Sequence, residues 1–324
     1  MSVRLGFIGC GGIANHHMRT LAQIEEADLV AFYDKDAERA KKAAAEYGGQ
    51  AYDDLETMLD DADLQACYMC TPPFAHGEEE LAVVSRGLGL FLEKPVARDM
   101  ETARKVEAAI RQAGVVNAVG YHWRHMPSTK RAEEVLAGKT VTAILGYWMG
   151  GLPGVYWWRR MDLSGGQMVE QTTHIVDLAR LFGGEVKAVA AAYGLLCLQD
   201  VEDLDVPDVG TMTLYFESGA VGTISNCCHL KMGFRVGIDI VACDTVVSIN
   251  GNRLTLKTEE GTEDEQLEGD PTLAEDLAFV QAVATGDTSG IRSDYSDAVR
   301  TLAVSLAANL SAEEKRVVEI AQIG

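Results

Sequence analysis

Short apolar runs alternate with helix-forming stretches over roughly the first 120 residues of the chain. Val3–Ile8 is an apolar run that ends in glycines, and the proline-free stretch Ile13–Ile24 after it has a composition compatible with a helix. The alternation continues through strands expected at Leu29–Tyr33, Leu64–Met69, Leu90–Leu92 and Val115–Val119, and helices expected at Ala37–Tyr47, Glu78–Arg86 and Met100–Ala113. Such alternation predicts a parallel, doubly wound α/β sheet. We therefore expect a first domain at residues 1–120.

The pattern changes from about Tyr121, where strand candidates begin to follow one another directly. After a helix expected at Ser128–Ala137, strands are expected at Val141–Met149, Val186–Tyr193, Gly210–Phe216, Ala220–Asn226, Val236–Ala242, Thr245–Ile249 and Leu254–Lys257. Glu217–Gly219, between two of these strands, is a turn typical of a β-hairpin. The second domain, at residues 121–324, is therefore expected to be an α/β domain with a mostly antiparallel sheet.

Helices and one acidic turn complete the second domain. One helix, from about Gln167 to Phe182, is expected to interrupt the strands. Two further helices, Leu273–Ala284 and Ser296–Leu310, are expected to close the chain. The acidic stretch Glu259–Glu265 is expected to be a solvated turn between strands.

Composition narrows the class of protein. The chain has 324 residues, and at about 150 residues per domain this length predicts two domains. Hydrophobic residues make up 47% and charged residues 24% of the chain, which is typical of a folded globular protein. The 28 basic and 49 acidic residues leave a net charge of -21, which repels nucleic-acid phosphates and anionic lipid headgroups. Neither nucleic acid nor a membrane is therefore an expected partner.

The seven cysteines predict a reducing compartment. Their number is odd, and most of them lie in apolar runs, where a free thiol packs as a small hydrophobic group. Cys67 and Cys70 have C-x-x-C spacing, but positions i and i+3 of a strand point to opposite faces, so no metal site is expected. The N-terminus also lacks the apolar stretch of a signal peptide, and glycines break the uncharged run Thr140–Trp158. We therefore expect a cytoplasmic protein.

A glycine-rich turn joins the first expected strand to the first expected helix. The sequence Gly9-Cys10-Gly11-Gly12-Ile13-Ala14 fits the pattern G-x-G-x-x-[G/A]. Gly9 permits the tight turn, Gly11 lets a pyrophosphate approach the backbone, and Ala14 lets the helix pack close to the strand. Together with Gly12 and Ile13 at the start of the helix, these residues are expected to bind the phosphates of a dinucleotide.

Asp34 follows the second expected strand, 20 positions after Ala14 because 34 − 14 = 20. A carboxylate at this position accepts hydrogen bonds from both ribose hydroxyls of NAD and repels the 2′-phosphate of NADP. NAD is therefore the expected cofactor, although Lys35 and Arg39 nearby soften the exclusion of NADP. The alternative is that Asp34 only caps the following helix.

The tripeptide Glu93-Lys94-Pro95 follows another strand of the first domain. The carboxyl ends of parallel strands open onto the expected cofactor site, so Lys94 is placed for chemistry. An ammonium group there donates to a substrate hydroxyl and stabilises negative charge that develops on its oxygen. Lys94 is therefore a candidate catalytic residue, and the alternative is a surface lysine beside a proline-bent loop.

Three polar side chains lie at helical spacing on the expected helix Gln167–Phe182. Glu170 and His174 are four residues apart, and Asp177 is three residues further on, so that all three share one face. A histidine with a near-neutral pKa is a natural proton acceptor, and a neighbouring carboxylate orients its ring. We expect His174 and Glu170 to be catalytic and Asp177 to contact the substrate. A surface salt-bridge cluster and a metal site made of the same groups are the alternatives.

Two polar-aromatic clusters, Tyr121–Arg124 and Tyr156–Arg160, are the remaining candidates for substrate binding. Aromatic faces pack against the C–H surfaces of sugars, while arginine and tyrosine donate to hydroxyls. The expected substrate contacts are Tyr121, Arg124, Tyr156, Trp158 and Arg159. The alternative is an aromatic cluster that only packs.

These motifs occur in a fixed order along essentially the whole chain: Gly9–Ala14, Thr71-Pro72-Pro73, Glu93-Lys94-Pro95 and Gly165–Asp177. In this order the chain resembles the glucose-fructose oxidoreductase, inositol dehydrogenase and rhizopine catabolism protein family. The resemblance implies an N-terminal Rossmann domain and a C-terminal α/β domain with an open, mostly antiparallel sheet. Because many members pair through that sheet, it also implies a homodimer or homotetramer.

The resemblance implies roles for individual residues as well. Lys94 and His174 would flank the nicotinamide and the substrate carbon. The cofactor site would extend to Thr71, Pro72, Pro73, His76, Glu93 and Lys94. Sugar dehydrogenases of the family often have Asp where this chain has Glu170, so the longer side chain leaves its role open.

Taken together, these features predict an NAD-preferring oxidoreductase that acts on a sugar, a cyclitol or a related polyol. His174 would take the hydroxyl proton while Lys94 binds the same oxygen. One alternative is a glycoside-processing enzyme that oxidises, eliminates and re-reduces with tightly bound NAD. Another is a dinucleotide-sensing regulator without turnover.

Overall fold

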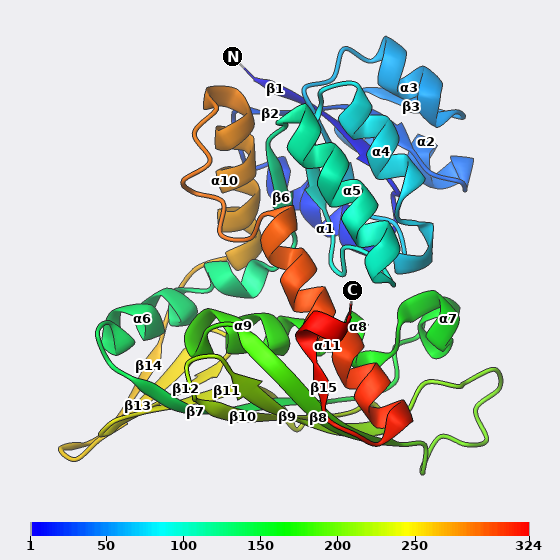
Figure 1. The fold of residues 1–324 in the computed structure, drawn as a ribbon. Helices are drawn as coiled ribbons and strands as arrows, with labels where there is room; N and C mark the ends of the chain where they lie inside the picture. The colour runs from blue at the N-terminus through cyan, green and yellow to red at the C-terminus, as the bar shows by residue number, and fades with distance from the viewer. Residues whose placement is uncertain (1, 324) are drawn as a thin grey trace. The chain divides into compact units, whose positions relative to one another are not determined.

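The computed structural model describes residues 2–323, and these form two compact units (Figure 1). The first unit comprises the segment up to Ala97, Glu101–His125 and Asp270–Val299; the second comprises Arg98–Met100, Met126–Gly269 and the segment from Arg300. The expected division at residues 120 and 121 placed the whole C-terminal part in the second domain. In the structure, Asp270–Val299 packs with the first unit instead, because its helix α10 (Pro271–Thr285) lies against α1 (Gly12–Leu21).

The first unit contains a six-stranded sheet in the order β3-β2-β1-β4-β5-β6. Its strands are β1 (Val3–Ile8), β2 (Ala27–Tyr33), β3 (Gln50–Tyr52), β4 (Ala66–Met69), β5 (Gly89–Leu92) and β6 (Asn117–Val119). All neighbouring strands pair in parallel. This is the strand order of a Rossmann fold, and it confirms the predicted doubly wound sheet. Because the order reverses between β1 and β4, the carboxyl ends of these strands mark the usual ligand-binding edge.

The remaining helices of the first unit connect these strands or, in the case of the last helix, follow the final strand. They are α2 (Ala37–Tyr47), α3 (Leu55–Asp61), α4 (Glu78–Ser85), α5 (Met100–Ala113) and the short 3₁₀ helices η1 (Pro73–Ala75) and η2 (His122–His125). The bounds of α2 and α5 agree with the expected ones. The sequence did not predict β3 or α3. A strand of 3 residues and a helix of 7 residues are both too short to give a clear periodic pattern.

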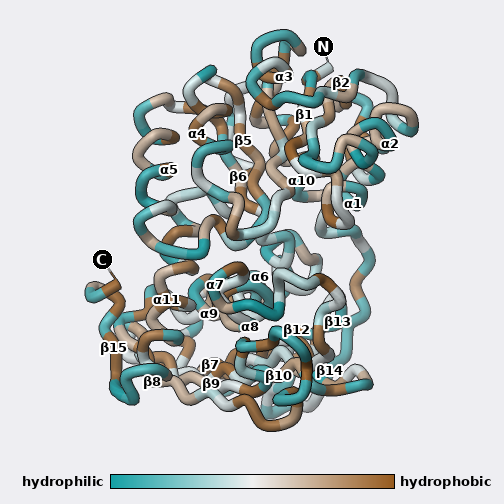
Figure 2. The backbone as a smooth tube through the Cα atoms, turned by 90° about the vertical axis from the view of Figure 1, so that its right-hand side faces the viewer, coloured by the Kyte–Doolittle hydropathy of each residue, from teal (hydrophilic) through white to brown (hydrophobic). Residues whose placement is uncertain are grey.

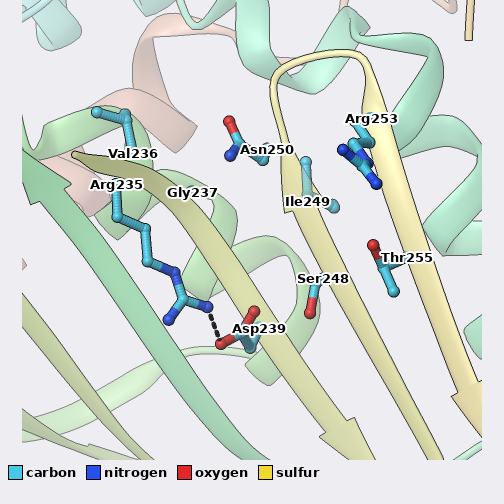
Figure 3. Close-up of a pocket in the computed structure, with 9 residues that line it drawn as sticks. All are labelled: Arg235, Val236, Gly237, Asp239, Ser248, Ile249, Asn250, Arg253 and Thr255. Atoms are coloured by element: carbon cyan, nitrogen blue, oxygen red, sulfur yellow. Dashed lines mark hydrogen bonds and ion pairs between the residues drawn. The ribbon is translucent and has the colours of Figure 1, made fainter. Parts of the chain in front are cut away.

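An aromatic cluster forms the centre of the first unit, whose strands are mostly hydrophobic (Figure 2). Tyr68 on β4 stacks on Phe7 of β1 and on Phe91 of β5, with ring centroids 5.1 and 4.5 Å apart. Phe279 of α10 meets Tyr68 and Phe91 edge-on, at 5.5 Å from each. All four rings are fully buried. Since removing a buried aromatic ring costs about 3–5 kcal/mol, α10 is an integral part of this core.

The second unit contains a nine-stranded sheet in the order β14-β13-β12-β11-β7-β10-β9-β8-β15. Its strands are β7 (Val141–Met149), β8 (Val186–Gly194), β9 (Val209–Phe216), β10 (Val221–Cys227), β11 (Arg235–Ala242), β12 (Thr245–Asn250), β13 (Arg253–Thr258), β14 (Gly261–Gln266) and β15 (Val318–Glu319). β7 and β10 pair in parallel, and the other neighbours pair antiparallel. The mostly antiparallel sheet is therefore confirmed.

One expectation for this sheet is wrong. The acidic stretch Glu259–Glu265 was expected to be a solvated turn, whereas β14 pairs antiparallel with β13 along its whole length. Opposite charges face each other across this pair: Arg253 forms an ion pair of 3.1 Å with Asp264. A strand at the edge of a sheet needs no continuous apolar face, and exposed charges there discourage pairing with other chains. The hydrophobic pattern alone therefore could not identify β14.

The helix expected at Gln167–Phe182 is interrupted in the structure. It consists of α8 (Gln167–Glu170) and α9 (Thr173–Gly183). At the break, the N–H of Thr172 donates to the carbonyl of Gln167, and Asn226 of β10 donates to the Thr172 hydroxyl at 2.9 Å. Because this hydroxyl is bonded to the sheet, the break is part of the packing between the helices and β10. The regular i,i+4 spacing assumed for Glu170 and His174 is lost there.

The helices α6 (Pro127–Leu136) and α9 lie on one face of the second sheet (Figure 1). Ile175 of α9 packs against β7 at Gly146, where an added Cβ would come within 2.5 Å of its side chain. Leu145, Tyr215 and Val221 point to the opposite face and are between 37 and 51% exposed. Within residues 2–323, no helix is long and apolar enough to cross a membrane.

Candidate functional site

The glycine turn between β1 and α1 has the geometry that a dinucleotide needs. Gly9 has φ of +87°, and a Cβ there would lie 2.6 Å from the carbonyl oxygen of Cys70, so only glycine fits. At Gly11 and Gly12 a Cβ would meet nothing within 4 Å. The turn therefore leaves open space beside the first backbone amides of α1.

The start of α1 fits the binding of a phosphate. Gly11 is the N-cap, and no side chain caps the free amides of this helix. Ala14 is fully buried, as close packing of the helix on the sheet requires, whereas the large apolar side chain of Ile13 is 41% exposed. These features of Gly9–Ala14 fit a dinucleotide whose pyrophosphate lies at the helix N-terminus.

Asp34 is bonded to the glycine turn itself. Its Oδ2 accepts from the N–H of Cys10 and its Oδ1 from the N–H of Asp36, both at 2.8 Å. The N-cap of α2 is Asp36, so capping is not the role of Asp34. The basic neighbours are paired elsewhere, Lys35 with Glu79 at 3.7 Å and Arg39 with Asp36 at 3.3 Å. The carboxylate of Asp34 is thus a negative charge fixed beside the turn.

The Thr71–Pro73 segment follows β4 at the same sheet edge and leads into η1. His76, predicted as a cofactor contact, has a buried side chain whose Nε2 bonds the carbonyl of Thr71 at 3.0 Å. Its Nδ1 forms an ion pair with Glu80, also at 3.0 Å. Burial alone would lower the pKa of His76, but Glu80 outweighs it and raises the pKa. These bonds show how His76 fixes the turn at Thr71.

Glu93 belongs to a buried network that the sequence did not reveal. His17 of α1 lies between two carboxylates, with Nε2 3.0 Å from Glu93 and Nδ1 2.8 Å from Asp276 of α10. Tyr68 also donates to Asp276, at 3.2 Å. Burial alone would lower the pKa of His17, but both carboxylates outweigh it and raise the pKa to about 10. Imidazolium at position 17 therefore compensates two buried negative charges.

Lys94 is connected to this network by its backbone, because its N–H donates to the Glu93 carboxylate at 3.1 Å. Gly120 makes room for that carboxylate, since a Cβ would lie 2.8 Å from Glu93 Oε1. The side chain of His122 lies within electrostatic range of Glu93 and Lys94. Burial, helped by the charge of Lys94 and opposed by that of Glu93, lowers the pKa of His122 to about 4. A neutral imidazole therefore accompanies the ammonium group of Lys94.

The other two residues predicted in this unit are buried. Tyr121 is 1% exposed, and Arg124 is 6% exposed. Arg124 forms an ion pair with Asp297 and donates to the carbonyl of Arg292 at 2.7 Å. These bonds join η2 to the chain segment that follows α10.

His174 and Asp177 lie on α9 in the second unit. The ring of His174 is 4% exposed and stacks on Trp148 of β7, with centroids 5.9 Å apart. Asp177 is fully buried and accepts a hydrogen bond from Thr301 at 3.0 Å. Arg180 also donates to Thr301, at 2.6 Å. The bonds of Asp177 therefore join α9 to α11 (Tyr295–Glu314).

Glu170 forms a contact that the sequence did not predict. Its carboxylate accepts a hydrogen bond of 2.6 Å from the indole N–H of Trp158, which is itself 1% exposed. Trp158 and Arg159 belong to the 3₁₀ helix η3 (Tyr156–Arg159), whose Tyr156 is 56% exposed. The bond thus fixes η3 to α8 and gives the longer side chain of Glu170 a definite partner.

His17 and Asp276 are the main residues that sequence reasoning missed. The buried residues of α1 include Ala14, His17, Met18 and Leu21, so His17 interrupts an apolar helix face. A histidine on such a face was a usable signal for a buried charge. Its partner Asp276, 259 residues away, carried no local signal.

Two family descriptions match the chain. Residues 3–121 match an oxidoreductase family with an NAD-binding Rossmann fold, and residues 137–261 match the GFO/IDH/MocA C-terminal domain. The two matches follow one another along the chain and together cover more than half of it.

Curated relatives and solved structures agree with these matches. The chain is 25% identical to the myo-inositol 2-dehydrogenase of Thermotoga maritima, over 99% of each chain. It is 26% identical to D-xylose 1-dehydrogenase (NADP(+)) 2 of Haloferax volcanii, over 97% of this chain and 99% of the relative. The fold is that of levoglucosan dehydrogenase in complex with NADH, with a TM-score of 0.90 at 20% identity over 99% of each chain. From its two matched domains and its fold, the chain belongs to the GFO/IDH/MocA family of NAD-binding oxidoreductases.

Proposed function

We propose that this protein is an NAD-preferring dehydrogenase that oxidises a secondary hydroxyl of a sugar, cyclitol or related polyol, or reduces the corresponding ketone. One observation carries the proposal: four neighbouring parallel strands end in groups suited to the same reaction. β1 leads to the glycine turn at Gly9, β2 to Asp34, β4 to Thr71 and β5 to Lys94. Ligands of such sheets bind at the carboxyl ends of the strands.

In the proposed reaction, the side chains of the protein accept the hydroxyl proton of the substrate and stabilise the charge on its oxygen. NAD supplies the acceptor for the hydride that leaves the carbinol carbon. In the oxidation, His174 accepts the proton of the substrate hydroxyl. Lys94 donates a hydrogen bond to that oxygen and stabilises the charge that develops on it. Glu93, fixed by His17, positions Lys94 through its backbone N–H.

The substrate class rests on the relatives named for myo-inositol and D-xylose. Of the predicted substrate contacts, Tyr156 has the most exposed side chain, so we assign it to the substrate first. Trp158 is buried against Glu170 and Arg124 is buried against Asp297, so both are assigned to positioning. Asp177 is likewise assigned to positioning, because it bonds Thr301 inside the second unit.

The test is hydride transfer by the full chain with a panel that includes myo-inositol and D-xylose, followed through NADH absorbance. His174→Gln keeps a hydrogen-bonding group but cannot accept the proton, so kcat falls on the order of 10²–10⁴-fold while NAD affinity is unchanged. Lys94→Met lowers kcat to a similar extent. The matched control is Lys130→Met, which removes an exposed lysine on α6.

Two results would contradict the proposal. Wild-type rates in both variants would refute the roles of His174 and Lys94. NAD binding without hydride transfer to or from any polyol or ketose of a broad panel would favour a regulator. The double variant adds a further check, because two groups that act on one oxygen give far less than multiplicative losses.

The uncovered face of the second sheet supports a further part of the proposal, namely assembly into a homodimer or homotetramer. Leu145, Tyr215 and Val221 lie on that face, and Val221 pairs directly with Tyr215. Apolar side chains gathered on an exposed sheet face favour association with a complementary surface. We also propose a cytoplasmic location, because all seven cysteines are free thiols.

A further inference from the structure

Three side chains with metal-binding atoms meet at one end of the sheet of the second unit. Cys197 lies in the loop after β8, Asp208 directly precedes β9, and His229 follows β10. The thiol, a carboxylate oxygen and a ring nitrogen all lie within 4.8 Å of one another. In a tetrahedral zinc site with bonds of about 2.0–2.3 Å, ligand atoms are roughly 3.3–3.8 Å apart. Only small side-chain movements therefore separate this cluster from a coordination site.

We propose that Cys197, Asp208 and His229 form a zinc-binding site. The donor set of one thiolate, one imidazole and one carboxylate is typical of zinc. Magnesium and calcium prefer oxygen ligands, so this set discriminates against them. Three protein ligands leave the fourth tetrahedral position to a water molecule.

The hydrogen bond of His229 leaves one ring nitrogen suited to a metal. Its Nδ1 lies 3.1 Å from the backbone carbonyl oxygen of Asp208. A carbonyl only accepts hydrogen bonds, so Nδ1 carries the proton and Nε2 carries the lone pair. Metal-ligating histidines are commonly oriented by such a bond from the other ring nitrogen.

Asp208 is a buried carboxylate fixed in place before any metal binds. Its Oδ2 accepts from the backbone N–H groups of Leu196, Cys197 and Leu198, while its Oδ1 accepts from Leu196 alone. Oδ1 thus keeps a lone pair for a cation.

A zinc ion at this place would stabilise a loop that contacts η3. Loop residues 195–208 connect β8 to β9. Tyr156 donates to Asp203 at 3.3 Å, and the N–H of Asp205 donates to the carbonyl of Arg159 at 3.1 Å. Zinc would therefore act at a distance on the segment that carries the candidate substrate side chain Tyr156.

The test is zinc binding by the full chain after removal of metals with a chelator. Equilibrium dialysis against zinc chloride, followed by elemental analysis, is expected to give one zinc per chain and a higher Tm. Cys197→Ser and His229→Asn each weaken binding at least about 10-fold, because each removes a ligand. Cys243→Ser is the matched control, since Cys243 is also an exposed free thiol but lies between β11 and β12. Magnesium chloride gives no shift in Tm.

Two further readouts separate this site from adventitious zinc. Cobalt in place of zinc gives a thiolate-to-cobalt charge-transfer band, which Cys197→Ser abolishes and Cys243→Ser retains. Zinc also slows alkylation of Cys197 while leaving that of Cys243 unchanged. Binding of less than one zinc per chain, or equal binding by Cys197→Ser and wild-type protein, would overturn the proposal.

Discussion

At the scale of single residues, the first unit contains a buried network of charged side chains. His17, Glu93 and Asp276 share a site from which water is largely excluded. Burial raises the pKa of the Asp276 carboxyl, whereas His17 outweighs burial at Glu93 and lowers the pKa there. Removing the middle member of such a network leaves two buried carboxylates without their compensating charge.

We therefore predict that His17→Asn lowers the free energy of unfolding by about 3–5 kcal/mol at slightly acidic pH. The pKa of His17 is raised from 6.5 to about 10, so its stabilisation is complete below 6.5 and lost as the pH rises through 10. The difference between variant and wild type should shrink over that range. Urea unfolding at a series of pH values measures it. His16→Asn on the same helix is the control, and a pH-independent difference would contradict the assignment.

We predict that Asp34 makes the protein prefer NAD over NADP. Because its carboxylate is fixed beside the glycine turn, it repels the additional phosphate of NADP. We expect wild-type protein to bind NAD more tightly than NADP, and Asp34→Ser to reduce this preference about 10-fold or more. Calorimetric titration with both cofactors measures the ratio. Asp36→Ser removes the neighbouring carboxylate as a control, and an unchanged ratio in Asp34→Ser would refute the role.

At the scale of elements, α10 depends on its first turn. Asp270 is its N-cap and accepts hydrogen bonds from the N–H groups of Thr272 and Leu273, at 2.9 and 3.2 Å. Asp270→Ala leaves both amides without this acceptor, so we predict a loss of about 1 kcal/mol in the free energy of unfolding. Urea denaturation measures it. Asp270→Asn retains the acceptor, so its free energy of unfolding should fall only slightly. Equal losses of stability in both variants would argue against capping.

Elements with a clear hydrophobic pattern were predictable from the sequence, whereas features that depend on contacts with residues far away in the chain were not. β7 has the expected bounds of Val141–Met149 because it is an uncharged, largely apolar run. β14 was missed because an acidic edge strand is specified by its pairing with β13. The break between α8 and α9 depends on Asn226, which comes from another strand. Sequence motifs likewise singled out Gly9, Asp34 and Lys94 as candidates, which remain predictions, whereas the contacts of His17 and Glu170 became visible only in the fold.

At the scale of the whole molecule, the uncovered sheet face predicts an assembly. Light scattering should give a multiple of the 35.0 kDa chain mass at micromolar concentration. Val221→Glu places a charge beside Tyr215 on that face and should shift the protein toward monomer. Lys187→Glu changes an exposed residue of β8 as a control. A wild-type protein that remains monomeric would refute this assembly.

The position of α10 also determines when the chain can fold during synthesis. The ribosome finishes the Rossmann strands by Val119, but Asp276, the second carboxylate partner of His17, emerges only after Met126–Gly269 of the second unit. At about 5–20 residues per second, translation from residue 125 to 299 takes roughly 9–35 s. During that interval the apolar surface later covered by Phe279 is exposed, and His17 lacks its second carboxylate. We expect the nascent chain to need chaperone protection until α10 leaves the exit tunnel.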